Sequence, residues 1–383
     1  MDERTSLSIP ILDLSWAENA KRPLLLEELR KALYEVGFLY IINHGVQKST
    51  MTKLIDVLPS LFALPTEEKV KLSKLNNPHF LGYSGFAEET TLGKQDLREQ
   101  FDLATELPVV YQGKAISDRF TVINDIREDK SGRDFTKLYW LLRGPNQWPN
   151  VPEFKEAFLE YHDALQDLSY RFVHLIEEAF DIPKGTFDHF FGNAGPQINR
   201  DCRTFLPPQH RIKLLRYPPL DHVDSRQGVG AHKDSSGWLT FLMQVGNAPG
   251  LEVLSADGQW IKAPPIDGTF VVNFGNAFEA ATEGAVKATT HRVIAPGPGD
   301  NVRYSVPFFQ GLPLDMTVSE VRSFIPERVR RLRKSNGDDA NVSSFLDQRW
   351  DSLGESQLRK WIRSHKDVGL KWYGQDIVDY YMS

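Results

Sequence analysis

Between residues 213 and 309 the chain is divided into short apolar segments, a pattern that few folds can accommodate. The segments alternate apolar and polar residues or are brief apolar runs, and glycines and prolines separate them. Segments of this kind are typical of short β-strands joined by tight connections. About seven such strands in so short a stretch favour a β-sandwich or a jelly-roll barrel. The predicted strands are Lys213–Tyr217, Val229–His232, Trp238–Gln244, Leu251–Leu254, Phe270–Phe274, Thr290–Ile294 and Tyr304–Phe309.

Helical patterns flank this strand-rich region. Apolar residues recur three and four residues apart from Leu24 to Val36 and again from Phe154 to Ile176, which predicts two amphipathic helices. The short segments Ile9–Leu12 and Phe38–Ile42 predict strands on either side of the first helix. Helical patterns return after Val318. The fold class that we expect is therefore α+β, with a jelly-roll core flanked by helices.

The composition excludes several classes of protein. The chain has 383 residues, of which 41% are apolar and 25% are charged, so it is neither a disordered chain nor a coiled-coil rod. Its net charge of −6 provides no basic field for nucleic acid. Because Cys202 is the one cysteine, neither an intrachain disulfide nor a Cys-based zinc site can form.

The sequence also lacks the signals of membrane insertion and of export. No apolar run approaches the length of a membrane span, and neither end carries a secretory leader or a lipidation motif. The expectation is a cytoplasmic protein that acts on a small molecule, with no nucleic acid, no membrane and no obligate protein partner.

The residues with the clearest chemistry are His232, Asp234 and His291. His232 and Asp234 are two apart on a predicted strand, so their side chains share one face of it. His291 lies on another predicted strand. Two imidazoles and one carboxylate are the ligand set with which non-haem oxygenases hold Fe(II), with open positions left for other ligands. Zinc accepts the same ligands, although it more often takes three protein ligands and one water.

A second pair of polar residues follows the last of these ligands. Arg303 and Ser305 are again two apart on a predicted strand. The neighbouring residues Val306 and Phe308 mark this strand as buried. A guanidinium can bind a carboxylate through two parallel hydrogen bonds, and a hydroxyl adds a further donor. The sequence therefore predicts a carboxylate-binding pair beside a metal site.

In this order and spacing, the motifs His232-x-Asp234, His291 and Arg303-x-Ser305 resemble those of the Fe(II)- and 2-oxoglutarate-dependent dioxygenases of the isopenicillin N synthase-like class. The segments 9–13 and 37–46 resemble the N-terminal domain of that family. The resemblance implies a double-stranded β-helix core, iron bound by the two histidines and the aspartate, and dioxygen as the oxidant. It also implies that Arg303 and Ser305 hold the distal carboxylate of 2-oxoglutarate.

Many members of that family carry Asn-x-Tyr on the strand before the His-x-Asp motif, and both residues help to hold the co-substrate. Here the segment is Leu215-Arg216-Tyr217, so the tyrosine is present and the asparagine is not. The resemblance implies that Tyr217 contacts 2-oxoglutarate. We expect Lys213 or Arg216 to supply the missing donor.

A narrower resemblance concerns the loop 82–96, which is similar to the corresponding loop of the ethylene-forming enzymes. In that branch a Glu and a Thr of the loop contact an arginine substrate, and the matching positions are Glu89 and Thr91. The branch has Tyr directly after the aspartate ligand, whereas this chain has Ser235. The resemblance implies L-arginine as substrate and, more narrowly, ethylene formation. The alternative is a larger or less basic substrate, because Ser235 leaves the pocket wider on that side.

Four regions are expected along the chain. Residues 1–108 form the N-terminal region of helices and strands, and residues 109–200 form a connecting insertion with the long helix. Residues 201–315 form the double-stranded β-helix core, and residues 316–383 form the C-terminal helices.

The expected activity couples the oxidative decarboxylation of 2-oxoglutarate to succinate with the oxidation of a small molecule. The alternatives are a hydroxylase or desaturase of a secondary metabolite, a same-fold oxidase that does not use 2-oxoglutarate, a zinc hydrolase, and a non-enzymatic small-molecule binding module. No glutamate stands beside the ligands as the base of a zinc hydrolase. A binding module has no need for an open metal site.

Overall fold

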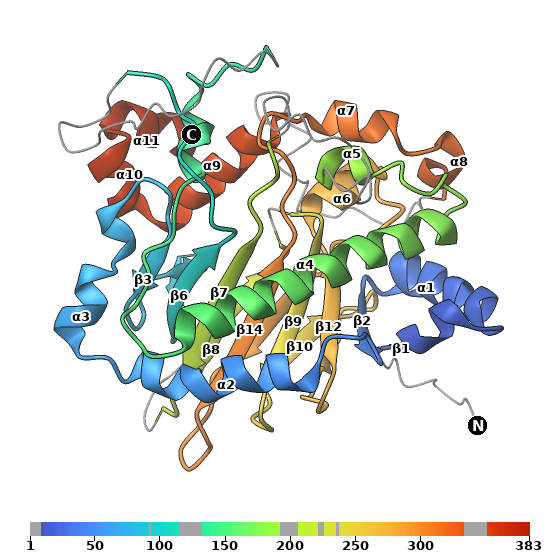
Figure 1. Ribbon diagram of the computed structural model, residues 1–383, viewed down its shortest axis with the longest axis horizontal. Helices are drawn as coiled ribbons and strands as arrows, with labels where there is room; N and C mark the ends of the chain where they lie inside the picture. Colours follow the sequence, from blue (N-terminus) through green and yellow to red (C-terminus); the bar gives the residue numbers. More distant parts are fainter. Residues whose placement is uncertain are drawn as a thin grey trace.

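The computed structural model places two β-sheets against each other (Figure 1). A cavity lies between them. The structure describes residues 9–91, 93–114, 132–191, 206–220, 226–234, 237–332 and 351–383. Among the predicted site residues, Ser235 lies outside the described residues, as does Cys202. The two sheets confirm the predicted jelly-roll core with helices around it.

All seven strands predicted between residues 213 and 309 are present, with ends that differ by at most about two residues, as helix and strand boundaries commonly do. The larger sheet has eight strands and the smaller has four, and two further strands pair with each other as a hairpin. The larger sheet has the order β1 (Ile11–Asp13), β2 (Phe38–Ile42), β12 (Phe270–Phe274), β9 (Leu239–Val245), β14 (Arg303–Phe309), β7 (Arg211–Tyr217), β6 (Glu99–Ala104) and β3 (Gly82–Ser84). The smaller sheet has the order β11 (Trp260–Lys262), β10 (Leu251–Leu254), β13 (His291–Ile294) and β8 (Gln227–His232), and the hairpin joins β4 (Thr90–Thr91) to β5 (Lys94–Gln95).

The central strands of the larger sheet are apolar on both faces because both faces are covered. Residues such as Leu39, Val272 and Phe308 point to the outer face and belong to the main core with the helices. Phe38 and Leu215 point the other way and pack against residues of the smaller sheet. This explains why the strands appear in the sequence as short apolar runs rather than as strict alternations.

Three long helices cover the outer face of the larger sheet (Figure 1). They are α1 (Arg22–Glu35), α2 (Lys48–Phe62) and α4 (Phe154–Ala179). In α4, Phe158, Leu165 and Phe172 are fully buried, and each contributes about 1.5–3 kcal/mol of hydrophobic free energy. The shorter helices are α3 (Thr66–Lys71), α5 (Asp188–Phe191), α6 (Asn276–Ala281), α7 (Val318–Ser323) and α8 (Glu327–Arg330).

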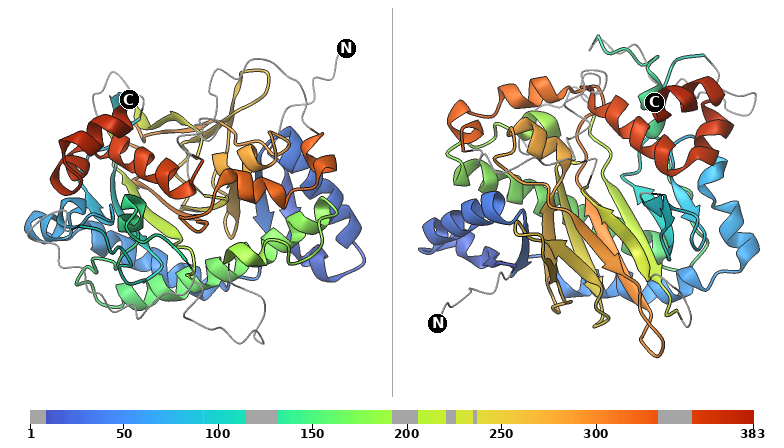
Figure 2. Two further views of the ribbon diagram at one scale, coloured as in Figure 1. Left: turned by 90° about the horizontal axis from the view of Figure 1, so that it is seen from above. Right: turned by 180° about the vertical axis from the view of Figure 1, so that it is seen from behind.

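The C-terminal helices form a separate group beside β3 and β6 (Figures 1 and 2). They are α9 (Leu353–Ser364), α10 (Lys366–Trp372) and α11 (Gln375–Met382). The Ser352 hydroxyl caps α9 by accepting a hydrogen bond from the Glu355 backbone N–H, and Trp361 of this helix packs on Phe80. This packing sets one side of α9 against the cavity.

None of the described helices combines the length and the apolar character that a membrane crossing requires.

Candidate metal and carboxylate site

The pairing of β8 with β13 brings the three predicted metal ligands together. His232 and His291 are register partners, and their ring centroids are 4.3 Å apart. Asp234 follows β8 by two residues, and its Oδ1 lies 3.7 Å from Nε2 of each histidine. The ligand atoms of all three residues lie within 4.8 Å of one another, and no other group of this kind occurs among the described residues.

Backbone carbonyls orient both imidazoles. Nδ1 of His232 donates to the Gly230 carbonyl at 2.8 Å, and Nδ1 of His291 donates to the Thr289 carbonyl at 3.1 Å. A carbonyl only accepts, so each Nδ1 carries the proton and each Nε2 presents its lone pair to the space beside Asp234. Burial and the neighbouring His291 lower the pKa of His232 to about 3, which keeps this imidazole neutral.

The Asp234 carboxylate is held through one of its two oxygens. Oδ2 accepts hydrogen bonds from Thr240 Oγ1 and Asn273 Nδ2, each at 2.6 Å. Burial would raise the pKa of Asp234, but the two imidazoles and these hydrogen bonds outweigh burial and lower it. Oδ1 therefore remains for a metal ion, and the set of two imidazoles and one carboxylate fits Fe(II).

Arg303 lies on β14 in the same cavity and is 1% exposed. Its Nη2 donates to Gln244 Oε1 at 3.0 Å, its Nη1 contacts Ser305 Oγ at 3.3 Å, and its Nε has no hydrogen-bond partner. None of the ion pairs among the described residues involves Arg303. A buried guanidinium with neutral partners and an unused donor fits a ligand that brings a carboxylate.

Residues of β7 separate into two faces at this site. Tyr217 is the register partner of Arg303, and the Arg303 guanidinium carbon lies 4.9 Å from the Tyr217 ring centroid. Lys213 lines the cavity on the same face, but it precedes Tyr217 by four positions, which corresponds to about 13 Å along a strand. Arg216 points to the opposite face and pairs with Glu99 at 2.7 Å. Of the two expected donors, only Lys213 therefore faces the cavity.

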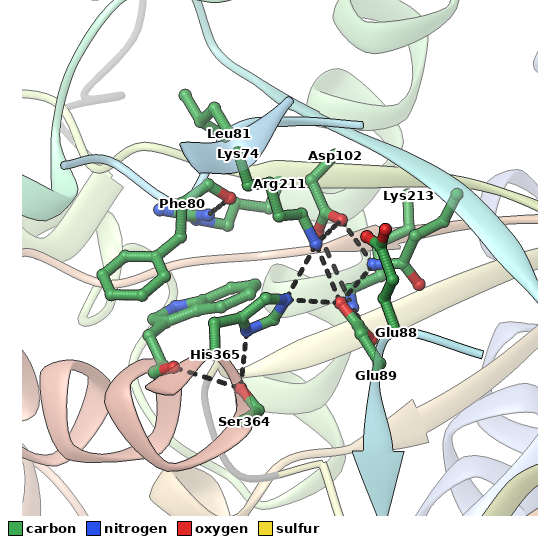
Figure 3. A network of polar contacts seen from close by, with 12 residues as sticks. Lys74, Phe80, Leu81, Glu88, Glu89, Asp102, Arg211, Lys213, Ser364 and His365 are labelled. Carbon is green, nitrogen blue, oxygen red and sulfur yellow. Dashed lines mark hydrogen bonds and ion pairs between the residues drawn. The ribbon is translucent and has the colours of Figure 1, made fainter. Parts of the chain in front are cut away.

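The structure places Glu89 in the cavity wall but surrounds its carboxylate with donors from the protein (Figure 3). A carboxylate has about four acceptor sites, and five side chains approach this one. Oε1 accepts from Gln100 at 2.6 Å, His365 at 2.7 Å and Lys74 at 2.8 Å, and Oε2 lies 2.8 Å from Arg98 and 3.5 Å from Lys213. Burial would raise the pKa of Glu89, but Lys213, Lys74 and His365 hold it well below its usual value.

Thr91 also lines the cavity, and its hydroxyl is directed into the protein. It donates to Asp96 Oδ2 at 2.8 Å, while Asp96 Oδ1 accepts from the Gly230 backbone N–H at 3.1 Å. A Cβ on Gly230 would lie 2.8 Å from Thr91 Cβ, so the glycine allows the hairpin to lie directly on β8. Glu89 and Thr91 thus fix the loop beside the metal ligands.

The cavity has a volume of about 630 Å³ and is lined by both sheets, the hairpin and α9. Two kinds of lining residue are not among the residues predicted from the sequence. Asn273 is a polar residue within the buried strand Phe270–Phe274, and this interruption of an apolar run was a usable signal. Lys360 and Trp361 of α9 come from a distant part of the chain, and their sequence gives no sign that they reach the cavity.

Removing the hydrogen bonds that orient Asp234 is expected to weaken metal binding. Partners of metal ligands commonly contribute about 10–100-fold to metal affinity. We expect Asn273→Leu to raise the Kd for Fe(II) by about that factor, as measured by anaerobic metal titration. Gln259→Leu, an exposed change in the turn between β10 and β11, is the control. An unchanged Kd in Asn273→Leu would show that the Asp234 carboxylate does not need this partner.

Two family models match most of the chain. Residues 9–151 match the non-haem dioxygenase in morphine synthesis N-terminal model, and residues 208–311 match the 2OG-Fe(II) oxygenase superfamily model. A "2-oxoglutarate-dependent dioxygenase frbJ" from Dothideomycetidae sp. (strain 11243) is 39% identical, over 95% of this chain and 92% of the relative. A "2-oxoglutarate-dependent dioxygenase" from Gibberella zeae is 30% identical, over 96% of this chain and 91% of the relative. A "Homoarginine-6-hydroxylase 2-ODD-C23.1" from Arabidopsis thaliana is 29% identical, over 81% of this chain and 86% of the relative.

A solved structure supports the same fold. A full-length protein of Neurospora crassa, crystallised in complex with alpha-KG and thymine, superposes with a TM-score of 0.65 at 20% identity, over 94% of this chain and 98% of that chain.

Proposed function

Because this chain belongs to the Fe(II)- and 2-oxoglutarate-dependent dioxygenases, we propose that it oxidises a small organic molecule in the cavity between its sheets, with His232, Asp234 and His291 as the iron ligands. The observation that carries this assignment is that Asp234 Oδ1 and the two Nε2 atoms lie close together. In each of the three side chains, the other polar atom makes a hydrogen bond that fixes the orientation of the group. The second half of the proposal is that Arg303, Ser305 and Tyr217 hold 2-oxoglutarate.

When bound, iron and 2-oxoglutarate supply the oxidising chemistry, with consumption of dioxygen and release of succinate and carbon dioxide. The protein positions these groups and excludes water. Arg303 neutralises the distal carboxylate of the co-substrate, and Ser305 adds a donor on the same face of β14. Apolar side chains on both sheets, including Leu242, Val229 and Val293, close the cavity around the metal ligands.

The test is the formation of succinate from 2-oxoglutarate by the purified protein with Fe(II) and dioxygen. We expect succinate with 2-oxoglutarate and Fe(II), and none when either is omitted or when a chelator is added. Binding of 2-oxoglutarate, measured by calorimetry without dioxygen, gives a second readout that does not depend on turnover. Absence of both binding and succinate would reject the proposal.

The substrate contact expected for Glu89 stays a prediction, and the geometry favours a different role. A guanidinium at Glu89 would have to displace one of the five donors that already surround its carboxylate. We propose that Glu89 positions the surrounding lysines and His365 of α9. Succinate and headspace ethylene, measured with and without L-arginine, test the arginine alternative.

A positioning role for Glu89 predicts a large loss of stability when its charge is removed. Glu89→Gln removes a negative charge that compensates Lys74, Arg98 and Lys213. Removing one partner of a buried ion pair typically lowers the free energy of unfolding by about 3–5 kcal/mol. We expect a loss of that size in the free energy of unfolding, measured by urea denaturation without any substrate. Glu88→Gln, an exposed change at the next position, is the control and should be near neutral. Equal stability of the two variants would remove the positioning role.

A further inference from the structure

The cavity borders a small recess between the larger sheet and α9. The recess has a volume of about 30 Å³, which is the space of a single water molecule or a small polar group. Four of its lining residues also line the main cavity, and they are Lys213, Phe309, Lys360 and Trp361. A ligand in the cavity can therefore place one end in this recess.

Three cationic side chains meet at the recess around one indole ring. The Arg211 guanidinium carbon lies 4.5 Å from the Trp361 ring centroid, Lys360 Nζ lies 5.0 Å from it, and Lys213 Nζ lies 5.5 Å from it. The one carboxylate of the recess lining is Asp102. Its Oδ2 lies 2.6 Å from Lys74 Nζ, and its Oδ1 lies 3.7 Å from Lys213 Nζ.

Cations outnumber carboxylates among the described residues that line the recess. We define the Glu89 cluster as Lys74, Glu89, Asp96, Arg98, Asp102 and Lys213, in which three cations face three carboxylates. Arg211 adds a fourth cation, which is partly buried, and its guanidinium donates to neutral backbone carbonyls of His79, Phe80 and Leu142. A buried excess of positive charge is costly unless an anion compensates it.

Lys360 adds a further amine at the point where recess and cavity meet. Burial and the nearby Lys213 lower its pKa to about 8, and the carboxylate of Asp234 acts in the opposite direction. Lys360 therefore lies within electrostatic reach of both the recess and the metal ligands. Two lysines that line the same recess and disfavour each other's charge are stabilised together when an anion binds between them.

We propose that the recess binds an anionic group of the substrate, a carboxylate or a phosphate, through Lys213 and Lys360. This inference rests on the proposed function, because it assigns one end of the substrate that the same cavity oxidises. Glu89 and Asp102 are positioning residues that hold Lys213 at the recess. The acid group of 2-oxoglutarate is bound elsewhere, since Arg303 pairs with Tyr217 at the other end of β7.

The experiment compares acidic and neutral probes with six carbons each. They are added to the enzyme loaded with Fe(II) and saturating 2-oxoglutarate, without dioxygen. Calorimetry measures the Kd of hexanoate, hexyl phosphate and hexanamide. We expect at least one acid to bind about tenfold or more tightly than the amide, because each charged hydrogen bond contributes about one order of magnitude in affinity. The two acids distinguish a carboxylate site from a phosphate site.

Lys360→Met is expected to remove the preference for the acid. Lys213→Gln is the second variant, but Lys213 belongs to the Glu89 cluster and this variant can fail to fold. Lys360 lies outside that cluster, so Lys360→Met tests the proposal in either case. Lys366→Met, an exposed change at the start of α10, is the matched control and should keep the preference. Equal binding of acid and amide, no binding of either acid to the unaltered enzyme, or an unchanged preference in Lys360→Met overturns the inference. If 2-oxoglutarate itself does not bind, the proposed function fails instead.

Discussion

Asp234→Ala is expected to abolish the formation of succinate from 2-oxoglutarate. The substitution removes the one anionic ligand of the site and leaves two imidazoles, whose Nε2 atoms lose the carboxylate oxygen that lies 3.7 Å from each of them. Because loss of a partner of a ligand already costs about 10–100-fold in metal affinity, loss of the ligand itself should reduce iron binding further. Succinate release and Fe(II) titration measure the two effects.

The control for this variant is Asp267→Ala, which removes a carboxylate whose side chain is 93% exposed. It should keep both turnover and iron affinity. Circular dichroism separates a loss of the metal from a loss of the fold, since Asp234 is buried and its removal also frees Thr240 and Asn273. Unchanged turnover in Asp234→Ala would reject the assignment of the metal ligands.

Local patterns in the sequence were sufficient to predict the strands of the jelly-roll core and to place His232 and Asp234 side by side. The central strands of the larger sheet, such as β12 and β14, are rich in apolar residues because both of their faces are covered. The spacing of His232 and Asp234 works because residues two apart on a strand share a face. His291 was grouped with them because the three residues make up a known ligand set, and the resemblance supported this grouping. Local spacing alone could not place it there, since the pairing of β13 with β8 is a contact between distant segments.

The sequence did not reveal β6 or the role of α9, and the physical reasons differ. Strand β6 is entirely buried, yet it contains Glu99, Gln100 and Asp102, and these polar residues hide the strand pattern because their partners are charged residues from other elements. The helix α9 shows an ordinary amphipathic pattern, and nothing in it specifies that His365 at its end meets Glu89. The roles of Glu89 and Lys213 depend on this long-range pairing.

Arg303→Met is expected to weaken 2-oxoglutarate binding by at least tenfold. A hydrogen bond to a charged group contributes about 1.5–3 kcal/mol, and about 1.4 kcal/mol corresponds to a factor of ten in Kd. The partners of Arg303 within the protein are neutral or aromatic, so burial lowers its pKa and its charge costs free energy until a carboxylate arrives. The variant should therefore unfold at an equal or higher urea concentration than the unaltered protein when 2-oxoglutarate is absent.

Replacing a ligand-binding arginine lowers ligand affinity without lowering the stability of the ligand-free protein, whereas replacing a structural arginine lowers that stability. A ligand that binds only the folded state stabilises it more when its Kd is lower. At one concentration, 2-oxoglutarate should therefore raise the melting temperature of the unaltered protein and have little effect on that of Arg303→Met. The matched control is Arg216→Met on the neighbouring strand, which breaks an ion pair with Glu99 on the opposite face and should keep the affinity for 2-oxoglutarate. If Arg303→Met binds 2-oxoglutarate as tightly as the unaltered protein, the carboxylate is held by other residues and Arg303 is structural.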